Sequence, residues 1–169
     1  MAGGEVTRSG ALWPCLDLID DLLKESRQPP VLVLENVVGL LSLEQGRDFS
    51  AICLRLSELG YRYGAVVIDA KMFLPQSRPR VFLVAVHRSI AFSDELYSDS
   101  AREAWHPPVL VRAHSFLPMR AREDWVWWDL GVEAVLRANA LEDLIMLDGV
   151  EWNAPEETAR IVSMMNFRC

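Results

Sequence analysis

The stretch VLVLENV, residues 31–37, decides how the rest of the chain is interpreted. It is an apolar run too short for a typical helix, and Pro29 and Pro30 stand directly before it. Such a run between breakers predicts a strand that is buried on both faces of a sheet. We expect this strand to lie inside the sheet and to pair with a further strand that the residues upstream of it do not supply, because an uncovered apolar edge promotes aggregation.

A helix is predicted on each side of this strand. Residues 12–27 place their apolar side chains on one helical face, with Pro14 in the first turn. Residues 48–59 repeat the pattern, with Asp48 as the expected N-cap and Gly60 as the expected first residue beyond the helix.

Two more strands are predicted at residues 61–70 and 81–87, joined by the polar, proline-containing loop KMFLPQSRPR. The order helix, strand, helix, strand, loop, strand is typical of an α/β sheet. Residues 88–130 show little periodicity, although most of the tryptophans lie after residue 100. Further helices are predicted at 132–147 and at 154–165, the latter capped by Asn153.

Composition excludes several classes of protein. The chain has 169 residues, a formal net charge of −7 and no apolar run near the length of a membrane span. A soluble cytoplasmic protein is therefore expected, and the acidic charge argues against a general nucleic-acid coat. Its three cysteines form no CxxC pair and its three histidines show no ligand spacing, so no metal site is expected.

Two short segments carry side chains suited to chemistry. Glu35 ends the first predicted strand, where ligands bind in open α/β sheets, and an apolar strand would leave its carboxylate partly desolvated. From position alone, a strand-end acid that faces water is the simpler interpretation. In the second segment, Gln76, Arg78 and Arg80 alternate and could share one face of extended backbone, an array that suits phosphate or a polar base edge. A solvated loop with two arginines is the alternative.

Together these segments resemble the DNA cytosine-5 methyltransferases of bacterial or prophage type. ENV matches the sixth conserved block of that family, QSRPR matches the eighth, and RSGALWP looks like the block before the first helix. The resemblance covers residues 8–88 and, more loosely, residues 139–166. It implies the C-terminal half of a Rossmann-like methyltransferase sheet at residues 1–88, and the start of a variable target-recognition region at residues 89–169.

In this family a cysteine thiolate attacks C6 of a cytosine flipped out of double-stranded DNA, and C5 takes a methyl group from S-adenosylmethionine. The resemblance implies that Glu35 holds N3 and the exocyclic amine of the base, that Arg80 contacts the base near O2, and that Arg78 orients the pocket or meets the DNA backbone. It also implies that Gln76 shapes the loop and that Asn36 and Val37 hold the strand end. Leu12 would lie beside the adenine of the methyl donor.

The chain also departs from the family pattern. The Pro-Cys-Gln block of the nucleophile and the glycine-rich block for S-adenosylmethionine would both precede the RSG segment, and neither is present. Cys15 follows Pro14, but Leu16 stands where the family has Gln, and a buried place on an apolar helix face would quench its thiol. We therefore expect a partial methyltransferase that is inactive alone. The alternatives are a subunit of a split enzyme that needs a complementary chain, and a non-catalytic remnant that binds DNA or protein.

Overall fold

The computed structural model describes residues 12–131, 149 and 151–164. The chain divides into two compact units, residues 1–138 and residues 139–169. The first unit contains, in chain order, α1 (Leu12–Lys24), β1 (Val31–Val37), α2 (Arg47–Glu58), β2 (Tyr61–Asp69), β3 (Pro79–His87), β4 (Tyr97–Ser98), α3 (Pro108–Ser115), α4 (Met119–Glu123) and β5 (Trp127–Trp128).

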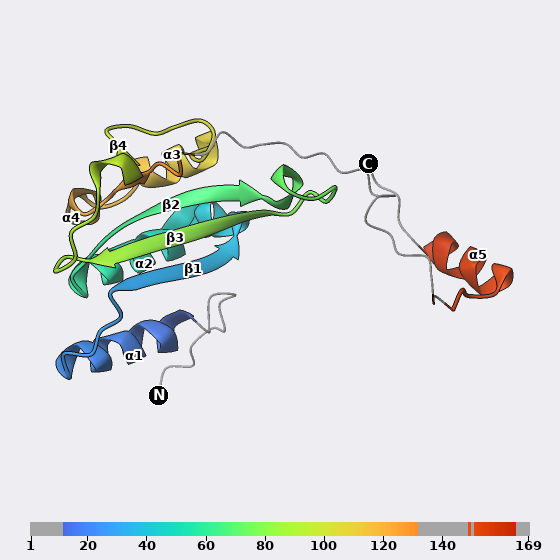
Figure 1. The fold of residues 1–169 in the computed structure, drawn as a ribbon, viewed down its shortest axis with the longest axis horizontal. Coiled ribbons are helices and arrows are strands. Elements are labelled where there is room, and N and C mark those ends of the chain that lie inside the picture. Colours follow the sequence, from blue (N-terminus) through green and yellow to red (C-terminus); the bar gives the residue numbers. More distant parts are fainter. Residues whose placement is uncertain (1–11, 132–148, 150, 165–169) are drawn as a thin grey trace. The chain divides into compact units, whose positions relative to one another are not determined.

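A three-stranded sheet in the order β1-β3-β2 forms the centre of this unit, and β3 is antiparallel to both of its neighbours (Figure 1). The mixed α/β architecture and the predicted strands are confirmed. The two predicted helices are also confirmed, although α1 ends at Lys24, before the Pro29-Pro30 breaker. Asp48 lies in the first turn of α2, whose N-cap is Gly46, so the predicted cap is wrong by two residues.

The prediction that the first strand is buried on both faces is wrong. β1 is an edge strand in this sheet, and its residues alternate between exposed and half-buried. Val31, Val33 and Val37 all point to the exposed side, and Val33 keeps 62% of its surface accessible. Burial on one face only is the pattern of an edge strand with helices beneath it.

The helices α1 to α4 contribute to one apolar core against a single face of the sheet. This core contains Leu16 of α1, Phe49, Ile52 and Leu56 of α2, and Tyr61 and Leu83 of the strands. The two buried tyrosines of β2 satisfy their hydroxyl groups, because Tyr61 donates to the Pro29 carbonyl at 2.7 Å and Tyr63 to the Ala121 carbonyl at 2.7 Å.

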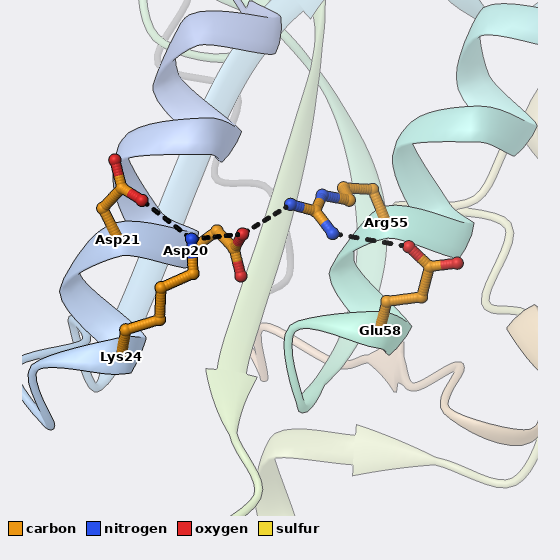
Figure 2. Close-up of polar contacts among 5 residues, drawn as sticks. All are labelled: Asp20, Asp21, Lys24, Arg55 and Glu58. Atoms are coloured by element: carbon orange, nitrogen blue, oxygen red, sulfur yellow. Dashed lines mark hydrogen bonds and ion pairs between the residues drawn. The ribbon is translucent and has the colours of Figure 1, made fainter.

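Ion pairs join α1 to α2 at the rim of this core (Figure 2). Asp20 lies 3.2 Å from Lys24 Nζ and 3.2 Å from Arg55 Nη2, and Arg55 also lies 3.5 Å from Glu58. The hydrogen bond from Lys24 lowers the pKa of Asp20 despite some desolvation. Such exposed pairs contribute little to stability individually.

The other face of the sheet is covered by residues that follow β3. Trp105 and Trp128 pack there against Val66 and Val86, and Trp128 Nε1 donates to the Val84 carbonyl at 3.0 Å. The region without periodicity thus packs against the sheet, and its short elements α3, α4, β4 and β5 were not predicted.

The same region protects the outer edge of β2. Tyr63 donates its amide to the Asp124 carbonyl at 2.9 Å and accepts from the Val126 amide at 2.7 Å. Gly64 permits this approach, since a Cβ there would lie 1.8 Å from the Val126 carbonyl oxygen.

The second unit contains one described helix, α5 (Pro155–Met164), which begins one residue later than predicted. The predicted helix at 132–147 falls outside the described residues. Within the described parts of both units, no helix is long and apolar enough to cross a membrane.

Replacing Gly64 by alanine is expected to lower the free energy of unfolding by about 3 kcal/mol, because the new methyl group meets backbone that cannot move cheaply. Gly39→Ala is the matched control, since its Cβ would make only ordinary contacts, the nearest at 3.5 Å from Leu43. Urea unfolding followed by tryptophan fluorescence measures both variants. Equal losses of stability would show that the 124–128 segment does not press on β2.

Candidate functional site

Glu35 and Arg80 meet on the less covered face of the sheet. In the β1–β3 register Glu35 lies opposite Phe82 and Val37 lies opposite Arg80, so the two charged residues are diagonal neighbours on one face. Arg80 Nε lies 3.2 Å from Glu35 Oε1, and Arg80 Nη1 donates to the Pro79 carbonyl at 2.9 Å. Two residues 45 positions apart in the sequence therefore form one ion pair.

The two members of this pair differ in burial. The Glu35 side chain is 56% exposed, which fits the simpler interpretation of a strand-end acid that faces water. Arg80 is only 23% exposed, and its guanidinium contacts both the Glu35 carboxylate and the Pro79 carbonyl. The arrangement offers an accessible carboxylate beside a fixed donor.

The neighbours of Glu35 in β1 lie on different faces. Val37 shares the exposed face and stands directly opposite Arg80, whereas Asn36 pairs with Val81 and points toward the helix-covered face. The Asn36 side-chain oxygen accepts the Val37 amide at 2.8 Å, which fits a role in holding the strand end.

The loop before β3 holds the remaining predicted polar residues. Gln76 lies in a tight turn in which its amide donates to the Leu74 carbonyl at 2.7 Å. The extended strand begins only at Pro79, so the prediction that Gln76 shares one extended face with the two arginines is wrong. Arg78 is exposed and leads directly into the strand that carries Arg80.

Asp69, the last residue of β2, is a residue that the sequence argument missed. Its carboxylate accepts the amides of Lys71 and Arg78 and the hydroxyl of Ser77. Desolvation alone would raise the pKa of Asp69, but these hydrogen bonds together with the Lys71 charge lower it. An aspartate at a strand end before a turn is a known capping signal, and this could have identified it.

The structure describes two of the three cysteines, Cys15 and Cys53. Cys15 is exposed, so the prediction that it is buried on the apolar face of its helix is wrong. Cys53 is completely buried in the main core, and burial raises the pKa of its thiol. Neither lies in the Pro-Cys-Gln context of the family's nucleophile.

Leu12, the expected neighbour of the methyl donor, is partly buried and packs against the main apolar core, and its role beside the donor stays a prediction. Among residues 12–131, 149 and 151–164, no cluster of three or more His, Cys, Asp or Glu side chains could hold a metal ion.

Comparison with known proteins identifies the same region of the sequence. The model of the C-5 cytosine-specific DNA methylase family matches residues 4–111. A type II methyltransferase of Bacillus subtilis, M.BsuFI, is 38% identical over 90 residues, which are 52% of this chain and 22% of the relative. The DNA-cytosine methyltransferase of Escherichia coli K12 is 40% identical over 75 residues, which are 39% of this chain and 16% of the relative.

The orphan methyltransferase M.Rho11sI of Bacillus phage rho11s is 34% identical over 83 residues, covering 48% of this chain and 16% of the relative. The matches thus span between 16% and 22% of the length of these three relatives.

The exposure of the two cysteines predicts a large difference in reactivity. A thiol reagent at neutral pH should modify Cys15 at least about 100-fold faster than Cys53, because the buried thiol is both inaccessible and protonated. Mass spectrometry of the labelled peptides separates the two positions. Comparable rates at both positions would contradict the packing of α2 described above.

Arg80→Ala and Glu35→Gln should each change the free energy of unfolding by less than about 1 kcal/mol, because half-exposed ion pairs contribute little. Arg88→Ala is the matched control. It removes both 2.6 Å contacts to Asp124, whose side chain is mostly buried, and should cost on the order of 2 kcal/mol. Urea unfolding distinguishes these outcomes, and a larger loss in Arg80→Ala than in Arg88→Ala would show that the Glu35–Arg80 pair is structural.

Proposed function

The chain belongs to the C-5 cytosine-specific DNA methylase family, and we propose that its Glu35–Arg80 pair is the part of a DNA cytosine-5 methyltransferase that holds the flipped cytosine. The observation that carries this proposal is the 3.2 Å contact that joins the ENV strand to the QSRPR strand. Members of the family use S-adenosylmethionine as methyl donor, and the relatives include type II enzymes of restriction–modification systems.

The chemistry of the pair suits the polar edge of cytosine. A cytosine presents an amine donor at N4 and acceptors at N3 and O2. The accessible carboxylate of Glu35 can accept from the amine and, when protonated, donate to N3, while Arg80 can donate to O2. Proton donation to N3 would make the ring a better electron acceptor at C6, which is the position a nucleophile attacks.

The chain alone supplies only part of such a site. We infer that the nucleophile and the methyl-donor site come from residues outside this chain, in a longer form of the protein or in a complementary chain. The edge position of β1 supports this inference, because its exposed Val31, Val33 and Val37 lie beside Glu35 and would be covered by further elements.

We assign residues 1–88 to the C-terminal half of a Rossmann-like catalytic sheet and residues 89–169 to the start of the target-recognition region. The order β1-β3-β2, with one antiparallel strand between two parallel ones, is compatible with this assignment. Trp105 and Trp128 then connect the two regions through the core that they share with β2 and β3.

The first test uses the purified chain by itself with tritiated S-adenosylmethionine and cytosine-containing duplex DNA. We expect no measurable methyl transfer, since positioning and electrostatics cannot replace the bond that the covalent nucleophile forms. Clear turnover would show that one of the chain's own cysteines is the nucleophile, and loss of that turnover in Cys15→Ala would identify it as Cys15.

The second test places residues 31–88 of this chain into the E. coli DNA-cytosine methyltransferase, in place of its matching segment. This hybrid should methylate DNA, and Glu35→Gln or Arg80→Ala should each lower kcat/KM by about 100-fold or more.

Glu44→Gln and Arg47→Ala are the controls, because these residues form a separate ion pair in which Glu44 is about as exposed as Glu35. Full activity in Glu35→Gln or Arg80→Ala would refute the proposed roles. A hybrid that folds, as judged by circular dichroism, but is inactive would refute the equivalence of the segments.

A further inference from the structure

We propose that Asp69 is a positioning residue for the two arginines, because its carboxylate closes the loop that presents Arg78 and leads into Arg80. This inference rests on the proposed function, which is what gives the two arginines their roles. The closure itself is a property of the loop and can be measured without DNA.

The contacts of Asp69 reach the far end of the loop. Its Oδ1 accepts the Arg78 amide at 2.7 Å and the Lys71 amide at 3.1 Å, and its Oδ2 accepts the Ser77 hydroxyl at 3.0 Å. The Asp69 side chain is only 14% exposed, whereas its partners Ser77 and Arg78 lie at the surface. One carboxylate thus joins the last residue of β2 to the two residues that precede β3.

The Ala70 carbonyl, the usual main-chain acceptor for the Arg78 amide, is already occupied. Ala70 donates to the Arg78 carbonyl at 3.3 Å, and in an ordinary hairpin Arg78 would donate back to the Ala70 carbonyl. That carbonyl already accepts the amides of Phe73 and Leu74, at 2.9 and 2.8 Å. The Arg78 amide therefore bonds to the Asp69 side chain instead.

Little else holds the second half of the loop in place. Residues 73–79 are all exposed, including the apolar side chains of Phe73 and Leu74. Loops without buried apolar contacts open at low cost in free energy. Hydrogen bonds to a carboxylate are stronger than neutral ones, so the bonds of Asp69 carry a large share of the loop's order.

The link from Asp69 to the ion pair is short. Arg80 follows Arg78 by two residues, and β3 begins at Pro79 between them. Fixing the backbone of Arg78 therefore fixes the direction of its side chain and the entry into β3. That entry places Arg80 within 3.2 Å of Glu35.

The test uses the full chain, labelled with nitrogen-15, at neutral pH. Asp69→Ala should speed hydrogen exchange of the Arg78 amide at least about tenfold. Asp69→Asn should restore most of the protection, because its amide oxygen can still accept from Arg78. Asp94→Ala is the matched control, since Asp94 is an exposed aspartate whose carboxylate accepts the Tyr97 hydroxyl at 2.8 Å.

A second readout follows the side chain of Arg80. Its Nε–H resonance should move in Asp69→Ala toward the position seen in Glu35→Gln, and should stay near the wild-type position in Asp69→Asn. A loss of general stability would not by itself move this resonance toward that of one specific variant.

Wild-type exchange at Arg78 and an unshifted Arg80 resonance in Asp69→Ala would overturn the proposal, as would an Asp69→Asn variant that behaves like Asp69→Ala. If Asp69→Ala does not fold, Ser77→Ala carries the test, because it removes only the bond to Oδ2 at an exposed position. It should speed exchange at Arg78 about threefold, and unchanged exchange would overturn the proposal. These results are independent of methyl transfer by the hybrid enzyme, so failure of either proposal can be recognised separately.

Discussion

The structure depends on the register of β3 between β1 and β2. Because β3 is antiparallel to both, its first residues lie beside the last residues of β1 and of β2. Arg80 is thereby brought next to Glu35 on one side, while Asp69 faces Pro79 on the other. A shift of the β1–β3 register by one residue would turn Arg80 to the helix-covered face and separate it from Glu35.

The two edges of the sheet differ in how far other residues cover them. The outer edge of β2 is bonded by residues 124–126 and by Trp105, and a glycine at position 64 allows the close approach. At the other edge, β1 keeps three valines accessible on the face that also carries Glu35. The most exposed apolar surface of the sheet thus surrounds the candidate site, as expected for a surface that further protein or DNA completes.

Much of the fold could be predicted from local pattern. The strands at 31–37, 61–69 and 79–87 and the helices α1 and α2 follow from apolar periodicity and from Pro and Gly breakers. The region after β3 could not be predicted in this way. Its order comes from tryptophans that pack on strands distant in the sequence, and such contacts leave no periodic signal.

The candidate site could likewise be predicted only in part from the sequence. Glu35 and Arg80 could be predicted as partners because their motifs resemble one family, but the degree of exposure of Glu35 depends on what covers β1, which the sequence does not encode locally. The cysteine at position 15 was misjudged because helical periodicity places it at the margin of the apolar face. Asp69 was missed because its role depends on a hairpin whose closing residues are set by tertiary structure.

The central claim is that Glu35 and Arg80 act as one site. A double-mutant cycle in the hybrid enzyme tests it most directly, with Glu35→Gln, Arg80→Ala and the double variant compared by kcat/KM. If both side chains hold the same base, the double variant should lose little more activity than the worse single variant, because residues that act as a unit are strongly non-additive. Losses that simply multiply in the double variant would show that the two residues act independently and would contradict this account.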